Sequence, residues 1–216
     1  MHKSHHKHYD KTKNIDFNCN LAQGFGIYKN ELEPQFLDYV SSVNISAGLH
    51  AGDPLTINKA LLQAKEKNVV IGASIGFNDL QGFGLRPMSL SKEDTEALVI
   101  YQIGAISALA SSLALEIEFV RPHGAMYEMA ATDFEFASNI VNAVKKYSQW
   151  LTYVGQAGEI IDRVAQELSI PVAREINLAK NYNADLSIDT DKEDITDINT
   201  LRMRFQKYMN YSQSMM

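Results

Sequence analysis

The sequence has little cysteine, no long apolar run and a shortage of positive charge. Its 216 residues contain one cysteine, Cys19, so no disulfide can form within the chain. This fits a reducing compartment, and we expect a cytoplasmic protein. No run of about 18 apolar residues occurs, which argues against a membrane partner. Acidic residues outnumber Lys and Arg by 26 to 20, which argues against nucleic acid, because phosphate binding needs clustered positive charge.

The first 13 residues differ in composition from the rest. Residues 1–13 hold four of the six histidines and four lysines against one aspartate. A metal-binding arm and a disordered leader both fit, and we favour the leader because composition is the sole support for metal. The segment has no apolar core, so it does not resemble a secretory signal. We expect residues 14–216 to form a single domain.

From residue 14 onward, short β-rich runs alternate with longer segments of helical spacing. We expect strands at Ile15–Asn20, Val43–Ala47, Val69–Ser74, Ile117–Arg121, Leu151–Gly155 and Val172–Ile176. We expect helices at Pro54–Lys67, Ser91–Leu115, Asp133–Lys146, Glu159–Leu168 and Ile198–Tyr211. Most strands are apolar runs, which favours burial on both faces. This order indicates an α/β fold, either a barrel or one doubly wound parallel sheet.

Two histidines follow expected strands. In parallel α/β folds, functional sites form at the carboxyl ends of the strands. His50 and His123 are the only histidines outside residues 1–13. Such a residue acts as a general base, a metal ligand or an oriented hydrogen-bond donor. A lone histidine more often positions a loop, but two at equivalent strand ends favour function.

The first expected strand carries Asp16, Asn18 and Asn20 on one face. A buried carboxylate needs a charged or hydrogen-bonding partner. For Asp16 this partner is either a substrate or metal, or else Arg121 or a backbone amide, and the sequence leaves both open. Cys19 has no adjacent base, so we interpret it as a core thiol.

Two Gly-Phe-Gly turns occur, at 24–26 and 82–84. Neither fits the dinucleotide fingerprint, and neither has the Lys-Ser/Thr of a phosphate loop. We expect both to be loops whose backbone approaches a ligand or another loop.

Five segments resemble, in order and at similar spacing, motifs of the LamB/YcsF family. They are Asn14–Leu21 with Gly24–Gly26, Asn44–Pro54, Asp79–Gly84, Tyr101–Ala105 and Arg121–Tyr127. The resemblance runs from about Asn14 to about Asp185. It implies a (β/α) barrel of the glycoside hydrolase/deacetylase type, commonly described with seven strands. About six strands are expected here, because the late His-Gly-Asp strand of the family has no counterpart.

The resemblance also implies an activity, that of the A component of 5-oxoprolinase. This is the ATP-dependent opening of 5-oxo-L-proline to L-glutamate, carried out with partner subunits B and C. ATP is expected as a cofactor because of this resemblance alone, since the sequence has no phosphate-loop motif. Strand-end carboxylates and histidines would handle proton transfers, and a divalent cation would stabilise developing charge.

The strand ends and the matching motifs together define the candidate site. The candidate catalytic residues are Asp16, His50, Asp53, His123 and Glu175. The candidate substrate-binding residues are Asn18, Asn20, Asn44, Ser74, Arg121 and Tyr127. No residue is assigned to a metal.

Several polar residues of the family pattern are replaced in this chain. Asn20 and Gln23 stand where the family has carboxylates, Ser74 where it has a histidine, Leu85 where it has an arginine and Ala179 where it has an aspartate. An amide keeps the shape of a carboxylate, but it cannot take up a proton or hold a cation as strongly. The chain is therefore either a working subunit with altered chemistry or an inactive paralogue that keeps the fold and a ligand or partner surface. A third alternative is a metal-dependent carbohydrate deacetylase that uses Asp16, His50 and His123.

A barrel without one strand exposes two strand edges. We therefore expect either marginal stability or completion of the barrel by a homo-oligomer.

Overall fold

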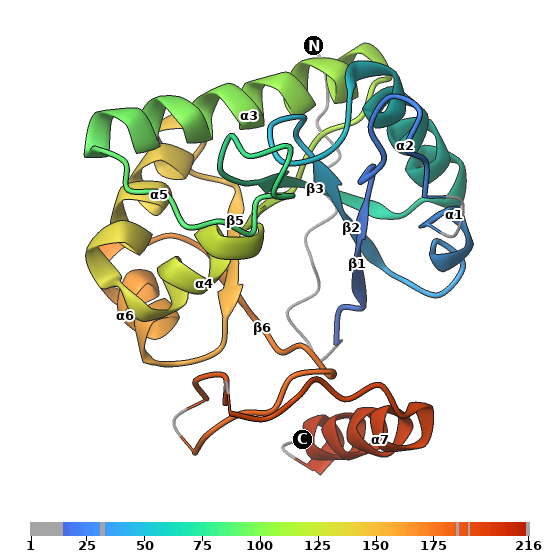
Figure 1. The fold of residues 1–216 in the computed structure, drawn as a ribbon, viewed down its shortest axis with the longest axis vertical. Helices are drawn as coiled ribbons and strands as arrows, with labels where there is room; N and C mark the ends of the chain where they lie inside the picture. The colour runs from blue at the N-terminus through green and yellow to red at the C-terminus, as the bar shows by residue number, and fades with distance from the viewer. Residues whose placement is uncertain (1–14, 31–32, 185, 190, 215–216) are drawn as a thin grey trace.

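The computed structural model describes residues 15–30, 33–184, 186–189 and 191–214, so the leader expected at 1–13 lies outside the described residues. In this part of the chain, six strands alternate with helices (Figure 1). The strands are β1 (Asn18–Leu21), β2 (Ser42–Ser46), β3 (Val70–Ile75), β4 (Phe119–Pro122), β5 (Thr152–Gln156) and β6 (Val172–Glu175). The helices are α1 (Glu33–Phe36), α2 (Pro54–Lys67), α3 (Lys92–Ser112), α4 (Gly124–Thr132), α5 (Phe134–Tyr147), α6 (Glu159–Leu168) and α7 (Ile198–Ser214). Of these helices, none is long and apolar enough to cross a membrane.

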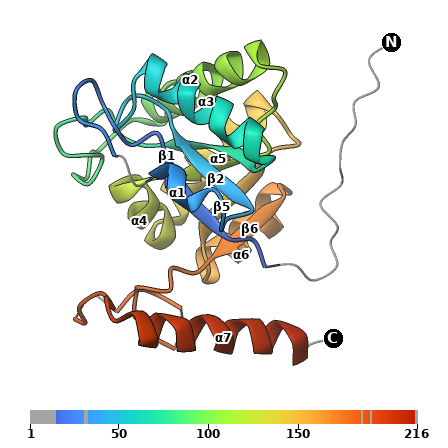
Figure 2. The same cartoon turned by 90° about the vertical axis from the view of Figure 1, so that its right-hand side faces the viewer.

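The strands form one parallel sheet in the order β1-β2-β3-β4-β5-β6. A doubly wound sheet reverses its strand order at one point, and this sheet does not. The fold is therefore a half-barrel of six strands, as the barrel alternative predicts. Figures 1 and 2 show most helices arranged around the outside of the sheet, with α7 lying apart along the bottom of the molecule.

The two faces of the sheet differ in polarity. Asn20 is paired with Asn44, and Ser46 with Ser74; residues paired in this way point to the same face, so the inner face is polar. The outer face carries buried apolar side chains that pack against the helices and form the core: Val43, Ile45, Ile71, Ala73, Ile75 and Val120. β2 is buried on both faces, as predicted for most strands, but its alternating sequence makes one of these faces polar.

Capping side chains define where the long helices begin. Asp53 accepts a hydrogen bond from the Thr56 amide at 2.8 Å, and Ser91 accepts one from the Asp94 amide at 3.0 Å. As a result, α2 has the predicted bounds and α3 begins just after its predicted cap. α6 also has the predicted bounds, although Gly158 at its N-cap makes no side-chain capping bond. The sequence did not indicate α1 and α4. α4 has His123 at its N-cap without a side-chain capping bond, so it carries no capping signal.

The C-terminal helix α7 joins segments from both ends of the sheet. Arg204 donates a hydrogen bond to the carbonyl of Lys180, just after β6, at 2.6 Å. The ring of Phe205 lies 4.9 Å from that of Phe17, which directly precedes β1. α7 therefore connects the two edge strands of the half-barrel.

Candidate functional site

His50 and His123 are stacked at the carboxyl end of the sheet. Their ring centroids lie 4.1 Å apart and their planes are nearly parallel, at 11°. His50 belongs to the loop between β2 and α2, and His123 directly follows β4. Both are buried. The structure thus brings together the two histidines that the sequence singled out.

Burial keeps both rings neutral at pH 7. It lowers the pKa of His50 to about 3, with a smaller contribution from His123. It also lowers the pKa of His123, to which the charge of Arg121 contributes. His123 Nε2 donates to the Phe83 carbonyl at 2.9 Å, which leaves Nδ1 as the acceptor of the neutral ring. Among the described residues, neither ring nitrogen of His50 has a hydrogen-bond partner.

The turn at 82–84 packs directly on the histidine pair. The Phe83 ring meets His123 edge to face, with centroids 5.0 Å apart. Gly84 has φ +71°, and a Cβ there would lie 2.9 Å from the Cβ of His50. Only glycine combines this backbone with so close an approach. The prediction that this turn approaches another loop is confirmed.

Asp79 holds this turn and was not a candidate residue. Its side chain is fully buried and accepts hydrogen bonds from the Gly82 amide at 3.0 Å and from Arg86 Nε at 2.9 Å. The Arg86 guanidinium lowers the pKa of Asp79 to about 2. An aspartate placed three residues before a glycine is a common turn signal, which could have identified it.

The inner face carries a cluster of buried polar side chains beside the histidines. Asn44 Nδ2 donates to Asn20 Oδ1 at 3.0 Å and also to Asn18 Oδ1. Asn44 Oδ1 and the hydroxyls of Ser46 and Ser74 are buried and have no partner among the described residues. An unpaired buried polar group costs about 1–3 kcal/mol, so three close together indicate a ligand site. Ser46 was not a candidate, although the alternation of β2 places it on this face.

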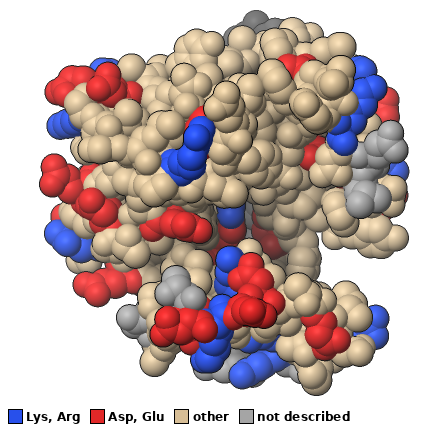
Figure 3. All heavy atoms as spheres, in the orientation of Figure 1, with Lys and Arg blue, Asp and Glu red and all other residues tan. Residues whose placement is uncertain are grey.

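Arg121 and Glu175 pair with each other rather than with a third group. Arg121 donates to the two oxygens of Glu175 at 2.5 and 2.6 Å, and its guanidinium lies 4.5 Å from the ring centroid of Tyr127. Burial would lower the pKa of Arg121, but Glu175 outweighs it and raises that pKa. The alternative that Arg121 pairs with Asp16 is therefore wrong. Figure 3 shows basic and acidic atoms in the hollow between the barrel and the C-terminal segment.

Asp16 lies at the opposite end of the sheet. Its carboxylate accepts hydrogen bonds from the hydroxyls of Ser41 and Ser42, both at 2.5 Å. Ser42 begins β2 and Ser46 ends it, a separation of about 13 Å along a strand. The metal triad of Asp16 with the two histidines therefore does not form. Within the described ranges, no group of three or more His, Cys, Asp or Glu is placed to hold a metal ion.

Asp53 uses both carboxylate oxygens for local structure. One accepts from the Thr56 amide at 2.8 Å, and the other from the Gly26 amide at 2.9 Å. These backbone hydrogen bonds lower the pKa of Asp53. Asp53 thus connects the turn at 24–26 to the start of α2.

Glu33 is a buried carboxylate that no sequence signal marks. It accepts a hydrogen bond from the Gln23 amide at 3.1 Å and so holds the loop after β1. Burial raises its pKa. Burial and the charge of Glu33 together raise the pKa of Cys19 to about 11. The Cys19 thiol is therefore protonated at pH 7 and packs against the core, as predicted.

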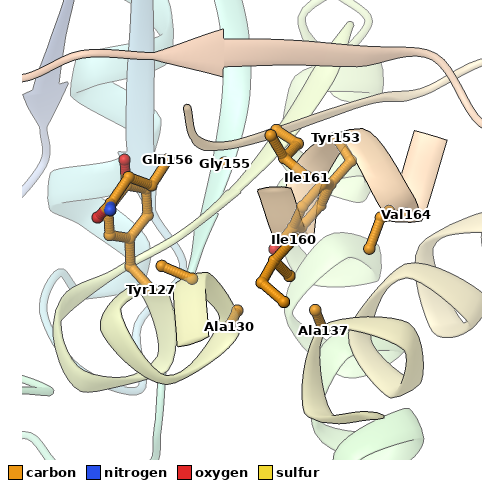
Figure 4. A pocket seen from close by; sticks show the side chains of 10 residues that line it. Tyr127, Ala130, Ala137, Tyr153, Gly155, Gln156, Ile160, Ile161 and Val164 are labelled. Carbon is orange, nitrogen blue, oxygen red and sulfur yellow. The ribbon is translucent and has the colours of Figure 1, made fainter. Parts of the chain in front are cut away.

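A small cavity lies among α4, α5, α6 and β5 (Figure 4). Tyr127, Tyr153 and Ile161 are among its lining residues. Its volume of about 10 Å³ is room for one water molecule at most. It is too small for a metabolite, so the polar inner face is the better candidate site.

Comparison with known proteins agrees with these observations. A model of the LamB/YcsF family matches residues 15–214. Relatives named as the A component of 5-oxoprolinase include those of Bacillus subtilis (strain 168), 40% identical over 171 residues, and Thermococcus onnurineus (strain NA1), 36% identical over 171 residues. Each alignment covers 79% of this chain, and 66% and 67% of those relatives, so the chain spans about two thirds of their length.

The same fold occurs in a solved structure. The crystal structure of the lactam utilization protein from Thermus thermophilus matches with a TM-score of 0.82 at 33% identity. The match covers 88% of this chain and 78% of that chain. It confirms the six-stranded half-barrel.

Proposed function

Because this chain belongs to the LamB/YcsF family, we propose that it acts as the A component of a 5-oxoprolinase. In this role it binds 5-oxo-L-proline and, with subunits B and C, takes part in its ATP-dependent hydrolysis to L-glutamate. The names of the relatives and the likeness to the Thermus lactam utilization protein support this proposal.

The unpaired polar atoms of the inner face carry the proposal. A lactam offers one N–H donor and one carbonyl acceptor. Asn44 Oδ1 is a buried acceptor without a partner in the described chain, and the hydroxyls of Ser46 and Ser74 are donors in the same condition. In our proposal Asn44 accepts the lactam N–H, while the two serines donate to the lactam oxygen.

His50 has an orienting role in this scheme. A neutral imidazole donates through one nitrogen and accepts through the other. His50 can thus hold the lactam or a water molecule, and both its ring nitrogens are unpaired among the described residues. Its pKa of about 3 makes it a weak base, so we assign it orientation rather than strong general-base catalysis.

The residues of this chain do not fit a nucleotide. The sequence has no Gly-rich phosphate loop, and the described part has no acidic cluster for a divalent cation. We therefore assign ATP and its cation to the complex with subunits B and C.

A second candidate is a protein that binds the lactam without turning it over. All three candidate catalytic carboxylates are engaged: Asp16 by two serines, Asp53 by backbone amides and Glu175 by Arg121. None is bonded to the histidine pair. This observation favours binding without catalysis.

Two measurements separate these candidates. The first is binding of 5-oxo-L-proline to the full chain by calorimetry, with Ser74→Ala as the variant that should weaken it. The second is glutamate release from 5-oxoproline and ATP in the presence of subunits B and C. The variant Asn20→Asp with Gln23→Glu is assayed beside it.

The outcomes assign the function. Binding with turnover supports a working enzyme component, and binding with turnover in the double variant alone supports a silenced one. Binding without turnover in either, by a folded and assembled sample, supports a purely binding role. No binding by the chain, alone or with subunits B and C, overturns the proposed function.

A further inference from the structure

A series of side-chain hydrogen bonds runs along the inner face from Asp16 to Asn44. Ser42 Oγ donates to Asp16 Oδ2 at 2.5 Å, and Asn18 Nδ2 donates to Ser42 Oγ at 2.7 Å. Asn44 Nδ2 then donates to Asn18 Oδ1 and, at 3.0 Å, to Asn20 Oδ1. Ser42 and Asn44 are 0% and 1% exposed, whereas Asn18, which joins them, is exposed. The series connects an exposed carboxylate to Asn44, which lies two residues, or about 7 Å, further along β2 than Ser42.

The carboxylate of Asp16 determines which group donates and which accepts in every hydrogen bond of this series. An ionised carboxylate only accepts, so the Ser42 hydroxyl must donate to Asp16. The Ser42 oxygen then accepts from the amide nitrogen of Asn18, which turns Asn18 Oδ1 toward Asn44. Asn44 must therefore direct its nitrogen at Asn18 and its oxygen the other way. That oxygen is the one without a partner among the described residues.

We propose that Asp16 is a positioning residue, which orients the Asn44 amide so that its oxygen faces the ligand as an acceptor. The inference rests on the proposed function and makes it more specific. The site then selects ligands that offer an N–H at this point. A ring oxygen in the same place would meet the Asn44 oxygen, acceptor against acceptor.

Asn20 does not orient the Asn44 amide, so in our proposal Asp16 does. An amide side chain can present either its oxygen or its nitrogen to Asn44, so Asn20 does not impose an orientation. A carboxylate at position 20 would accept from Asn44 Nδ2 whatever stands at position 16. The variant Asn20→Asp should therefore make Asp16 dispensable for ligand choice.

The test compares two ligands that differ in one atom. The first is 5-oxo-L-proline, and the second is its lactone analogue, with oxygen in place of the ring N–H. Both are titrated into the full chain, with and without subunits B and C. We expect the unmodified chain to bind the lactam at least about tenfold more tightly, because the lactone leaves a buried acceptor unpaired. In Asp16→Asn, which can donate as well as accept, the ratio should fall to about one.

Matched variants isolate the path. Ser42→Ala interrupts it and should lower the ratio in the same way. Ser41→Ala removes the other hydroxyl bonded to Asp16 without touching the path, and should preserve the ratio. Asp16→Asn with Asn20→Asp should recover the preference for the lactam. A loss of folding would weaken both ligands alike, so the ratio reports orientation rather than stability.

The results have separate meanings. Loss of the ratio in Asp16→Asn and its recovery with Asn20→Asp support the inference. Lactam-selective binding that persists in Asp16→Asn overturns the inference and leaves the proposed function intact. The same holds if Asn20→Asp does not restore the ratio. No binding of either ligand to the unmodified chain overturns the proposed function and this inference with it.

Discussion

The two ends of the inner face are built from similar side chains but differ in how these are paired. At the amino end, Asp16, Ser42 and Asn18 satisfy one another through short hydrogen bonds. At the carboxyl end, Ser46 and Ser74 are as buried as Ser42, yet they are unpaired within the described chain. Unpaired buried groups cost stability, and a fold retains them where they serve binding. Polar side chains on the inner face therefore do not by themselves identify the ligand site, whereas buried polar atoms without hydrogen-bond partners do.

The largest expected effect comes from breaking the ion pair that closes the carboxyl end. Glu175→Ala leaves the Arg121 guanidinium, whose side chain is 13% exposed, without its partner. We expect a loss of about 3–5 kcal/mol in the free energy of unfolding, measured by urea denaturation. Glu175→Gln, which keeps a hydrogen-bond acceptor, is the matched control and should lose less. Equal stability of Glu175→Ala and the unmodified chain would contradict the closed pair.

The next effect is the pH dependence that the histidine pair imposes. Because the pKa of His50 is lowered to about 3 in the folded chain, the unfolded chain takes up a proton near pH 6.5 that the folded chain refuses. Stability should therefore fall as the pH drops from 6.5 toward 3, by about 2 kcal/mol from His50 at pH 5. Urea midpoints at pH 7, 6 and 5 measure this.

The control for the pH effect is His50→Gln, which cannot titrate. It should show a flatter dependence over the same range, with the remaining slope due largely to His123, whose pKa is also lowered. An unchanged slope in this variant would show that His50 is not the titrating group.

A smaller effect compares one serine from each end directly. Ser42→Ala breaks two hydrogen bonds and should cost about 1 kcal/mol in unfolding free energy. Ser74→Ala removes a hydroxyl that is unpaired in the described chain, and should change stability by less than about 0.5 kcal/mol while weakening ligand binding. Denaturation and calorimetry on both variants check this. A large stability loss in Ser74→Ala would remove the contrast between the two ends.

The smallest expected effect concerns Asp53. Its two oxygens cap α2 and hold the turn at 24–26. Asparagine caps helices about as well as aspartate, but its single oxygen leaves the exposed Gly26 amide without its acceptor, so Asp53→Asn should cost about 0.5 kcal/mol in unfolding free energy and leave lactam affinity unchanged. Asp53→Ala, which loses the cap, should cost about 1 kcal/mol. A selective loss of affinity in Asp53→Asn would instead place the carboxylate in the binding site.

Local patterns in the sequence determined the elements and their order. The Asp53-Pro54 start signal predicted α2 to the residue, because a cap acts over only three or four positions. The six strands were predicted for the same reason, since β-rich runs between helical segments are local features. The position of His50 and His123 just past strands also follows from chain order, and parallel strands bring such ends together.

Tertiary structure alone decided which polar groups meet. Arg121 and Glu175 lie 54 positions apart, and Asp16 and Ser42 lie 26 apart. Nothing local distinguishes the true partner from the Arg121–Asp16 alternative. Likewise, the sequence shows that Ser42 and Ser74 are serines on strands. It does not show that, within the described ranges, the hydroxyl of Ser42 has hydrogen-bond partners and that of Ser74 has none. Pairing depends on strand register and sheet curvature, which arise from packing of the whole barrel and not from any short segment.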